Sequence, residues 1–226
     1  MTGSCGRGCS ELTLTGSPRV LVVELTANGK RYRTRLPLRF EPSSGQLAKR
    51  LLRRVKTGEP KIRAAVIHES LGAGSGAPSD TTYELRAPDR FAYQLSRAGE
   101  AVGDTIIIGG REWTRGPHVQ RWQASAYGGG GPAFAAASYL GWWNAYTTNP
   151  RVLDRYRAGS IQVAHIATLS ELRGIGPVWL RLRLDLTHRR LLHLRMITAA
   201  HFMTQTWAAS PRRILAPPAS EVDHSR

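Results

Sequence analysis

Residues 178–186, with the sequence VWLRLRLDL, alternate between apolar and polar side chains from Leu180 onward. In an extended chain the leucines of this stretch point to one side, and its arginines and aspartate point to the other. A period of two residues is typical of a β-strand that buries one face. After a short turn at 187–190, the run 191–206 resumes the β pattern, and we expect it to return antiparallel to the first strand. This stretch therefore predicts an antiparallel β-sheet near the end of the chain.

The same rhythm extends back along the chain to about residue 62. Short turns interrupt it, and the dipeptide Gly109-Gly110 is typical of a two-residue hairpin turn. A longer segment of small and polar residues, 72–79, is expected to be a flexible loop. We therefore predict further strands at residues 64–71, 81–85, 90–96, 104–108 and 111–114.

The beginning of the chain predicts a hairpin followed by a helix. Residues 19–25 are rich in valine and leucine, Asn28-Gly29 is typical of a hairpin turn, and residues 32–40 return with alternation. A serine that can cap a helix then precedes Gln46–Lys56, in which apolar residues recur at helical spacing. Glycine and proline end this helix, and its outer face is strongly cationic.

The remaining segments are less regular. Aromatic residues are frequent in 134–146, where we expect a short helix, and the prolines after Ser210 predict a loose tail. The chain then divides into an N-terminal hairpin appendage (1–40), a curled-sheet domain (41–209) and the tail (210–226). Because a sheet of many strands must bury one face, we predict a mainly β (α+β) fold. In it, a strongly curved antiparallel sheet, or half-open barrel, wraps around one long amphipathic helix.

Length and composition indicate a globular chain. With 226 residues, of which 41% are hydrophobic, the chain can bury a core without help from metals or disulfides. No apolar run approaches the roughly 18 residues that a membrane-spanning helix needs. The first residues show no charged segment followed by an apolar one, so no signal peptide is visible.

The formal net charge is +16, from 32 basic and 16 acidic residues. All but four of the basic residues are arginine, in a sequence rich in alanine, glycine and proline, and a GC-rich genome alone can produce this bias. The alternative is a polyanionic partner. RNA-binding, zinc-finger and helix-turn-helix patterns are absent from the sequence, which argues against nucleic acid. An anionic membrane surface is the other candidate, contacted by the dense cluster Lys49, Arg50, Arg53, Arg54 and Lys56.

Two segments resemble the lipoprotein-carrier superfamily of LolA-like and LppX- or LprG-like proteins. They are YELRAPDRFAY at 83–93 and IIIGGREW at 106–113, which place a glycine turn before a tryptophan. The run RMITAAHFM at 195–203, together with the two cysteines and the arginine-rich helix, is similar to a domain of actinobacterial CopD-type copper-resistance proteins. That domain is the extracytoplasmic one at their C-terminal end, and the resemblance covers residues 5–218.

The resemblance implies a non-enzymatic, extracytoplasmic and membrane-associated module that holds an apolar small molecule or lipid between sheet and helix. A curled sheet closed by a single helix leaves room for such a ligand. Each aliphatic side chain can instead belong to a filled core, and the tryptophans of the glycine-flanked middle can form a mobile lid or pack as core. The candidate cavity or lid residues are Phe91, Tyr93, Trp113, Trp122, Trp142, Trp143, Leu182, Leu184 and Met196.

The two cysteines allow three interpretations. Cys5 and Cys9 are separated by Gly-Arg-Gly, so an oxidising compartment can close a small disulfide between them. They can also remain free thiols. A soft-metal site would need further ligands, and none lie near them in the sequence.

Copper provides the second functional hypothesis, in which the chain is an accessory domain of a membrane copper-resistance protein. His193, His201 and Met203 share one strand parity, and imidazole with thioether suits copper(I). His193 and His201 would lie roughly 26 Å apart along a strand, so only His201 and Met203 can share an ion. Two ligands do not complete a site, and we therefore expect no resident cofactor, with copper as the one candidate.

Sequence motifs for catalysis are lacking. His68-Glu69 has no second histidine at the spacing of a zinc protease, and the glycines of 72–76 lack the Lys-Ser/Thr of a phosphate loop. Acidic residues are scattered, with no evident pair for acid-base chemistry. We therefore predict a binding protein and not an enzyme.

Overall fold

The computed structural model places the chain in two compact units, which are described separately below. Unit 1 comprises residues 1–58, 71–77 and 143–204, and unit 2 comprises residues 59–70, 78–142 and 205–226. The structure describes residues 2–3, 9–17, 20–27, 30–37, 44–73, 77–129, 134–172, 176–199, 201–209 and 213–223. Strands dominate both units and most pairs are antiparallel, so the prediction of a mainly β fold is confirmed.

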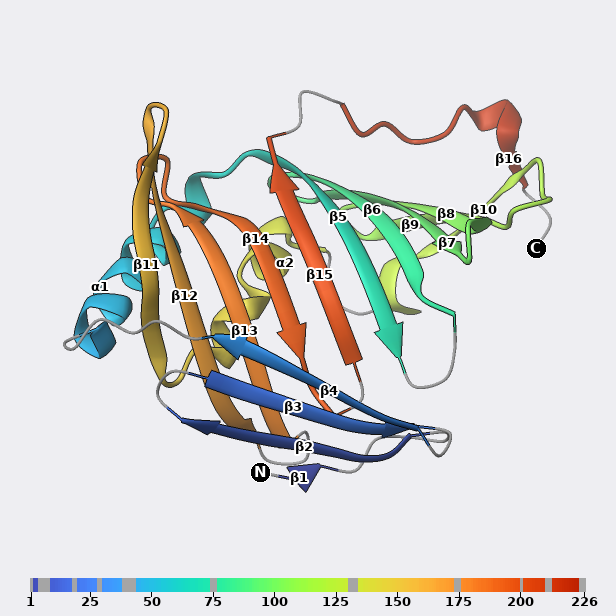
Figure 1. Ribbon diagram of the computed structural model, residues 1–226. Coiled ribbons are helices and arrows are strands. Elements are labelled where there is room, and N and C mark those ends of the chain that lie inside the picture. Colours follow the sequence, from blue (N-terminus) through green and yellow to red (C-terminus); the bar gives the residue numbers. More distant parts are fainter. Residues whose placement is uncertain are drawn as a thin grey trace. The chain divides into compact units, whose positions relative to one another are not determined.

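Unit 1 contains two sheets, of strand order β1-β2-β3-β4 and β11-β12-β13-β14 (Figure 1). Its strands are β1 (Thr2–Gly3), β2 (Cys9–Ser17), β3 (Val20–Ala27), β4 (Lys30–Pro37), β11 (Pro150–Ala158), β12 (Ile161–Leu172), β13 (Gly176–Asp185) and β14 (Arg190–Ile197). Its helices are α1 (Ser44–Lys56) and most of the 3-10 helix η3 (Trp142–Tyr146). Two further strands, β5 (Ala64–Ala73) and β15 (His201–Ala208), are divided between the units.

The predicted strands at both ends of unit 1 are confirmed. Residues 178–186 lie in β13 and the turn after it, and β14 returns antiparallel with Asp185 opposite Arg190. The hairpin predicted in the first 40 residues is formed by β3 and β4, in which Ala27 lies opposite Lys30. The structure adds β1 and β2 to this hairpin, which makes a four-stranded sheet.

The β11–β14 sheet is covered on both faces. Leu182 and Leu194 pair across the first face and are fully buried. On that face, Thr168 donates a hydrogen bond of 2.7 Å from its hydroxyl to the carbonyl oxygen of Tyr146 in η3. On the second face, Val23 of β3 belongs to a core cluster with Trp179 of β13. Figure 1 shows β3 and β4 in front of this sheet, with α1 behind β11.

Helix α1 has 13 residues, which is close to the average for globular proteins, so the prediction of a long helix is wrong. It begins two residues before the predicted start and ends where predicted. Ala48, Leu52 and Val55 are at most 3% exposed, because the helix packs this apolar stripe on β11 and β14. A helix of this length spans about 20 Å, too short for a large sheet to wrap around.

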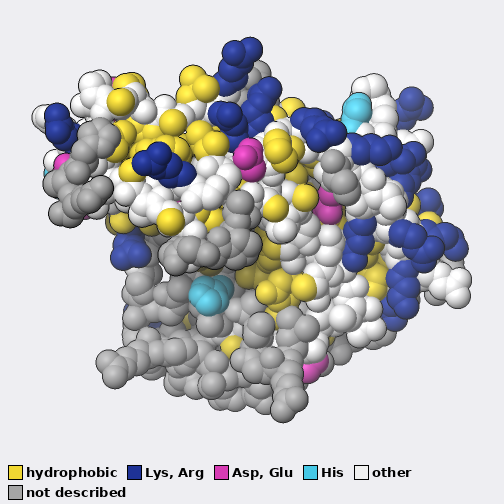
Figure 2. All heavy atoms as spheres, turned by 180° about the vertical axis from the view of Figure 1, so that it is seen from behind, with side chains coloured by type: hydrophobic (Ala, Val, Ile, Leu, Met, Phe, Trp, Pro, Cys, Tyr) yellow, Lys and Arg dark blue, Asp and Glu magenta, His cyan; other side chains and the backbone are white. Residues whose placement is uncertain are grey.

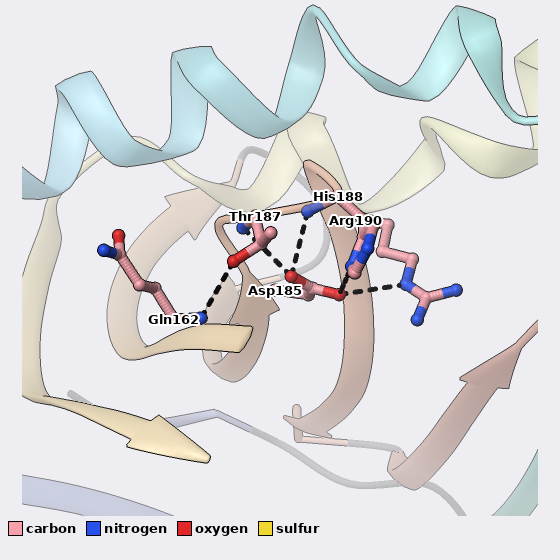
Figure 3. Close-up of polar contacts among 5 residues, drawn as sticks. All are labelled: Gln162, Asp185, Thr187, His188 and Arg190. Atoms are coloured by element: carbon pink, nitrogen blue, oxygen red, sulfur yellow. Dashed lines mark hydrogen bonds and ion pairs between the residues drawn. The ribbon is translucent and has the colours of Figure 1, made fainter. Parts of the chain in front are cut away.

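The turn between β13 and β14 is built around the fully buried carboxylate of Asp185 (Figure 3). Its Oδ1 accepts hydrogen bonds of 3.0 Å from the backbone N–H groups of Thr187 and His188, and its Oδ2 accepts from the side chains of His188 and Arg190. Burial acts to raise the pKa of Asp185, but these hydrogen bonds outweigh burial and lower the pKa. The end of α1 lies against this turn, since a Cβ on Gly58 would come within 2.4 Å of Arg189.

Unit 2 is a meander of antiparallel strands, in the order β6-β7-β8-β9-β10, with β16 parallel to β10. Its strands are β6 (Ser79–Arg86), β7 (Arg90–Arg97), β8 (Glu100–Ile108), β9 (Arg111–Arg115), β10 (Trp122–Ala126) and β16 (Val222–Asp223). Its helices are α2 (Ala136–Leu140) and the 3-10 helices η1 (Glu59–Lys61), η2 (Tyr127–Gly129) and η4 (Ala219–Glu221). The predicted strands 81–85, 90–96, 104–108 and 111–114 are confirmed, and Ile108 pairs with Arg111 across the glycine turn.

Three predictions need correction or completion. The tail beyond Ser210 is not loose where the structure describes it, because Ile214 and Val222 are buried and β16 pairs with β10. The prediction was a half-open barrel, and among the described strands the sheets do stay open, since β11 ends the sheet of unit 1 and β16 ends that of unit 2. The short helix predicted in 134–146 is present as two pieces, α2 and η3. None of the helices in the described residues has the length and apolarity needed to cross a membrane.

Candidate ligand-binding groove

Unit 2 has an open groove of about 340 Å³ on one face of its strands. Strands β6, β7, β8 and β9 supply its floor, Trp122 of β10 supplies one end, and residues 213–215 run along its side. All the residues that line it belong to unit 2. Its volume lies within the 300–1,000 Å³ that is usual for small-molecule sites.

The floor of the groove is set by strand register. Glu84 pairs with Ala92, Ala92 pairs with Ile106, and Ile106 pairs with Trp113, so these four side chains point to the same face of the sheet. Ile106 packs against a small core cluster that includes Trp113 and Trp122. Ala92 and Ile106 therefore form an apolar strip of the floor, beside polar side chains of β6 and β7 that also line the groove.

A fixed ion pair forms the polar wall of the groove. Asp104 in β8 lies opposite Arg115 in β9, and the Nη2 atom of Arg115 is 2.7 Å from the Oδ2 atom of Asp104. The guanidinium carbon of Arg115 also lies 4.4 Å from the centre of the Trp122 ring, within cation–π distance. Both charged side chains are about one-third exposed or less, so the two contacts hold Arg115 in place before any ligand arrives.

The C-terminal segment forms a strap along the groove. The side chain of Arg90 donates a hydrogen bond of 2.6 Å from its Nη1 to the carbonyl oxygen of Ile214, and Ile214 itself is 5% exposed. Further along, Val222 of β16 packs against Trp113 and Trp122. These two anchors leave Leu215 with 64% of its surface exposed at the groove.

The opposite face of the same strands is filled by aromatic rings. Tyr83, Phe91 and Tyr93 alternate with the groove residues in β6 and β7 and contact one another. Tyr83 and Phe91 also contact Tyr139, and Phe91 contacts Phe134, both from the segment that contains α2. The ring centres of Phe91 and Phe134 are 4.9 Å apart and nearly parallel. This face is a packed aromatic core of unit 2.

A polar network crosses the edge of this aromatic core. The carboxylate of Glu69 accepts one hydrogen bond of 2.9 Å from the Tyr83 hydroxyl and one of 2.6 Å from the Nε2 of Gln205. The Oε1 of Gln205 in turn accepts from the Trp207 indole, so the buried amide is satisfied at both ends. Burial, and secondly Glu69, raises the pKa of Tyr83 to about 12, and burial also raises the pKa of Tyr139. Both phenols therefore stay protonated near neutral pH and stabilise the core as hydrogen-bond donors.

The structure brings together only part of the predicted cavity set. Trp122 lines the groove and Trp113 lies beside it. Tyr93 borders the groove from β7, but its ring belongs with that of Phe91 to the aromatic core on the other face. The remaining candidates are outside the groove. Leu182, Leu184 and Trp143 are fully buried, and Trp142 and Met196 are half-buried.

Alternation along a strand identified residues that share a face, but it could not say which face would be hollow. The groove residues that were not predicted are chiefly Asp104, Arg115 and the strap residues Arg213 and Leu215. The first two could have been found, because the glycine turn at 109–110 fixes the register that places Asp104 opposite Arg115. The strap carries no local signal of the distant strands on which it docks.

The predicted metal ligands lie near the start of β15. His201 is exposed and Met203 is 6% exposed, so the two side chains differ in access to solvent. The described residues contain no group of three or more histidine, cysteine or acidic side chains that could hold a metal ion. Copper binding stays a prediction. Cys5 lies outside the described residues, so the disulfide with Cys9 also stays a prediction.

The predicted cationic face of α1 is present. Lys49, Arg50, Arg53 and Arg54 are exposed and form no ion pair with any residue that the structure describes. Lys56 is half-buried and donates a hydrogen bond of 3.4 Å to the Thr147 hydroxyl. Figure 2 shows lysine and arginine side chains gathered over the part of unit 1 where α1 and β11 lie.

No protein-family model matches the sequence, and no curated protein matches it. Among solved structures, the chain is similar to an uncharacterized conserved protein from Thermus thermophilus, with 10% identity, a TM-score of 0.44, and coverage of 78% of this chain and 98% of that one. It is also similar to a LolA superfamily protein from Nitrosomonas europaea, with 12% identity, a TM-score of 0.29, and coverage of 76% and 96%. A third match is MucB, with 12% identity, a TM-score of 0.39, and coverage of 80% and 63%. At TM-scores below 0.5, these matches establish neither the family nor the function of this chain.

Proposed function

We propose that this chain is a non-enzymatic binding module, and that the groove of unit 2 holds the apolar part of an amphipathic, lipid-like molecule. One observation carries the proposal: an open recess of about 340 Å³ combines an apolar strip of its floor with a strongly exposed leucine on its strap. The ligand lies on the groove face of the sheet, and not between sheet and helix as the sequence led us to expect.

Exposed apolar side chains around the groove support an apolar ligand. Leu215 is 64% exposed on the strap, and Val102, which lies at the β-bulge of β8, is 39% exposed. Val119, in the connection between β9 and β10, is 49% exposed. Clustered exposed apolar groups mark binding surfaces more often than scattered ones do. A ligand chain over Ile106 would cover this apolar surface.

The charges of the groove support an anionic head group on that ligand. Arg213 is exposed on the strap and forms no ion pair with any residue that the structure describes. Arg115, in contrast, is already neutralised by Asp104. A carboxylate at one end of an aliphatic chain would place its charge at Arg213 and its chain on Ile106. Fatty-acid-like molecules have this chemistry.

The proposal includes no catalytic step. No histidine or cysteine occurs among the described residues that line the groove, and the carboxylate of Asp104 is held by Arg115. The tyrosines with raised pKa belong to the aromatic core on the other face of the sheet. The groove thus offers shape and charge, with no nucleophile poised beside a base.

We further propose an extracytoplasmic location at an anionic membrane surface, contacted by α1. The support is the row of exposed cations on α1, each of which contributes about 1 kcal/mol near anionic lipid. Co-sedimentation with phosphatidylglycerol vesicles should decrease as salt is added, because screening weakens this attraction. Binding that is unaffected by salt would exclude this role for α1.

The groove is tested with a dansyl-labelled fatty acid, whose fluorescence rises in an apolar site. Ala92→Phe places a ring on the floor of the groove and should weaken binding at least about tenfold, equivalent to about 1.4 kcal/mol. Ala101→Phe is the matched control, because Ala101 is exposed on the neighbouring β8 and does not line the groove. Aromatic residues are well tolerated in strands, so both variants should fold.

Two results would refute the groove assignment. One is an equal loss of affinity in both variants, and the other is the absence of fatty-acid binding by the unmodified protein. Arg213→Gln then tests the head group. It should weaken binding of the labelled acid several-fold while leaving the binding of its uncharged methyl ester unchanged.

A further inference from the structure

Three arginines occupy two neighbouring rows on the second face of the β11–β14 sheet in unit 1. Arg181 in β13 lies directly opposite Arg195 in β14, and Arg183 lies opposite His193 in the next row. The three arginines are exposed and form no ion pair with any residue that the structure describes. We name these three side chains the arginine corner.

This arrangement is unfavourable for the isolated protein. Residues directly opposite in an antiparallel pair have Cα atoms about 4.5–5.5 Å apart. Side chains of like charge at such positions destabilise the pair. The positive charge of these arginines also acts on the half-buried His193. Burial lowers the pKa of His193 most, and Arg181, Arg183 and Arg195 lower it further. Positive charge is therefore concentrated where the sheet itself gains nothing from it.

The two acids nearest in register do not neutralise the corner. Asp185, two residues after Arg183 on β13, is fully buried and its carboxylate is bonded within the turn that follows. Asp154 lies at the β11 end of the row that contains His165, Arg183 and His193. The Oδ1 atom of Asp154 is 2.8 Å from the Nδ1 of His165. Asp154 itself is two strands away from Arg183. The guanidinium groups of the corner remain available to an anion from solution.

The N-terminal sheet limits what can reach this corner. The adjacent row on the same face contains Trp179 and Ile197, and both pack in the core cluster with Val23 of β3. Sheets packed face to face lie about 10 Å apart, so β1–β4 form a step beside Arg181 and Arg195. A flat bilayer would be held away by this step, whereas a small anion can enter beside it.

We infer that the arginine corner binds the phosphate group of a small soluble molecule. Guanidinium groups bind phosphate oxygens in a bidentate manner, and charge-assisted hydrogen bonds of this kind are among the strongest in proteins. Arg181 and Arg183 lie about 6.8 Å apart along β13, with Arg195 across from the first, so all three can reach one phosphate. This site is separate from the groove of unit 2 and does not depend on the function proposed for it.

The test is calorimetric titration of the full chain with inorganic pyrophosphate at low ionic strength. The double variant Arg181→Gln/Arg195→Gln should bind pyrophosphate at least tenfold more weakly than the unmodified protein. The matched control is Arg97→Gln/Arg121→Gln in unit 2, which removes the same charge from two exposed arginines that do not line the groove, and it should bind within twofold of the unmodified protein. Removing the facing charges should not impair folding, and circular dichroism checks this.

Several outcomes would overturn the inference. They are no binding of pyrophosphate, an equal loss in both double variants, or tighter binding of polyglutamate or of phosphatidic acid vesicles through the same arginines. Either of the first two outcomes would show that the arginine corner is not a specific phosphate site and contributes only to the general positive charge of the protein. The last would assign it to an acidic protein or to a lipid surface instead.

Discussion

Each unit contains a hairpin in which an aspartate faces an arginine across two strands, and the two pairs differ in burial. In unit 1, Asp185 lies opposite Arg190 and is fully buried. In unit 2, Asp104 lies opposite Arg115 and keeps 27% of its side chain exposed. The Asp185 carboxylate accepts two backbone and two side-chain hydrogen bonds, whereas Asp104 has its arginine at 2.7 Å beside a groove.

The difference shows how one residue pair serves stability in one place and a binding surface in another. A buried carboxylate is tolerated only when hydrogen bonds replace its lost hydration, and the turn that supplies them also supports the end of α1. A partly exposed carboxylate such as that of Asp104 keeps water as a partner, so its ion pair adds little stability. Asp104 instead fixes the position of Arg115 at the groove. Unit 1 therefore depends on its aspartate for folding, and unit 2 uses its aspartate to shape a site.

The largest expected effect comes from removing the two carboxylates in turn. Asp185→Ala should lower the free energy of unfolding by about 3 kcal/mol, because two backbone N–H groups and an arginine lose a buried partner. Asp104→Ala, the matched control, should lower it by at most about 1 kcal/mol. Urea denaturation of both variants measures the difference. Equal losses would show that burial does not distinguish the two pairs.

A second substitution tests the contact between α1 and the turn of Asp185. Gly58→Ala would bring a methyl group within 2.4 Å of the Cβ and the carbonyl oxygen of Arg189, and backbone must shift to admit it. We expect a loss of about 2 kcal/mol, as for other overpacked sites. Gly110→Ala is the control, because nothing lies within 4 Å of the added methyl group in the hairpin of unit 2. Thermal unfolding of the two variants compares them, and a similar melting temperature would contradict the contact.

The sequence predicted most of the strands and the helix, because these depend on local periodicity. The hairpins at 109–110 and 187–190 have turn residues that act over a few positions, and both formed with the predicted partners. The helix stripe of Leu52 and Val55 was likewise visible as helical spacing. The predicted architecture called this helix long, although the predicted range 46–56 is shorter than the 13 residues of α1.

The groove could be predicted only in part, because it depends on contacts between distant segments. Arg90 and Ile214, which anchor the strap, are 124 positions apart. The prolines near Ile214 indicated a loose tail, and the short apolar run 214–216 is too brief to show a periodicity. Leu182 and Trp122 looked alike as cavity candidates, yet Leu182 is covered on all sides and Trp122 lines the groove. Which sheet face is covered is a property of tertiary packing, and strand alternation does not contain it.

The pH dependence of stability sharpens the comparison of the two aspartates. The pKa of Asp185 is lowered in the folded protein, so between the folded and unfolded pKa values the unfolded chain binds more protons. The stability that Asp185 provides is therefore complete above the unfolded pKa of about 3.9 and is lost as the pH falls through the folded pKa. In urea titrations between pH 2 and pH 7, Asp185→Asn should flatten the acid limb of the stability profile. An unchanged acid limb in that variant would exclude Asp185 as a source of it.

The smallest expected effect is the coupling between Asp104 and Arg115, measured by a double-mutant cycle with Asp104→Ala and Arg115→Ala. Because both groups are partly exposed, we expect about 0.5 kcal/mol, decreasing as salt is added. Arg115→Lys keeps the charge but loses the planar stacking on Trp122, so it should retain most of this coupling while lowering affinity for the dansyl-labelled fatty acid. That separation of stability from binding follows if the pair exists to position a groove wall. If Arg115→Lys instead reduced stability as strongly as Asp185→Ala, the ion pair in the hairpin of unit 2 would serve mainly to stabilise the fold. The aspartates of the two hairpins would then have the same role.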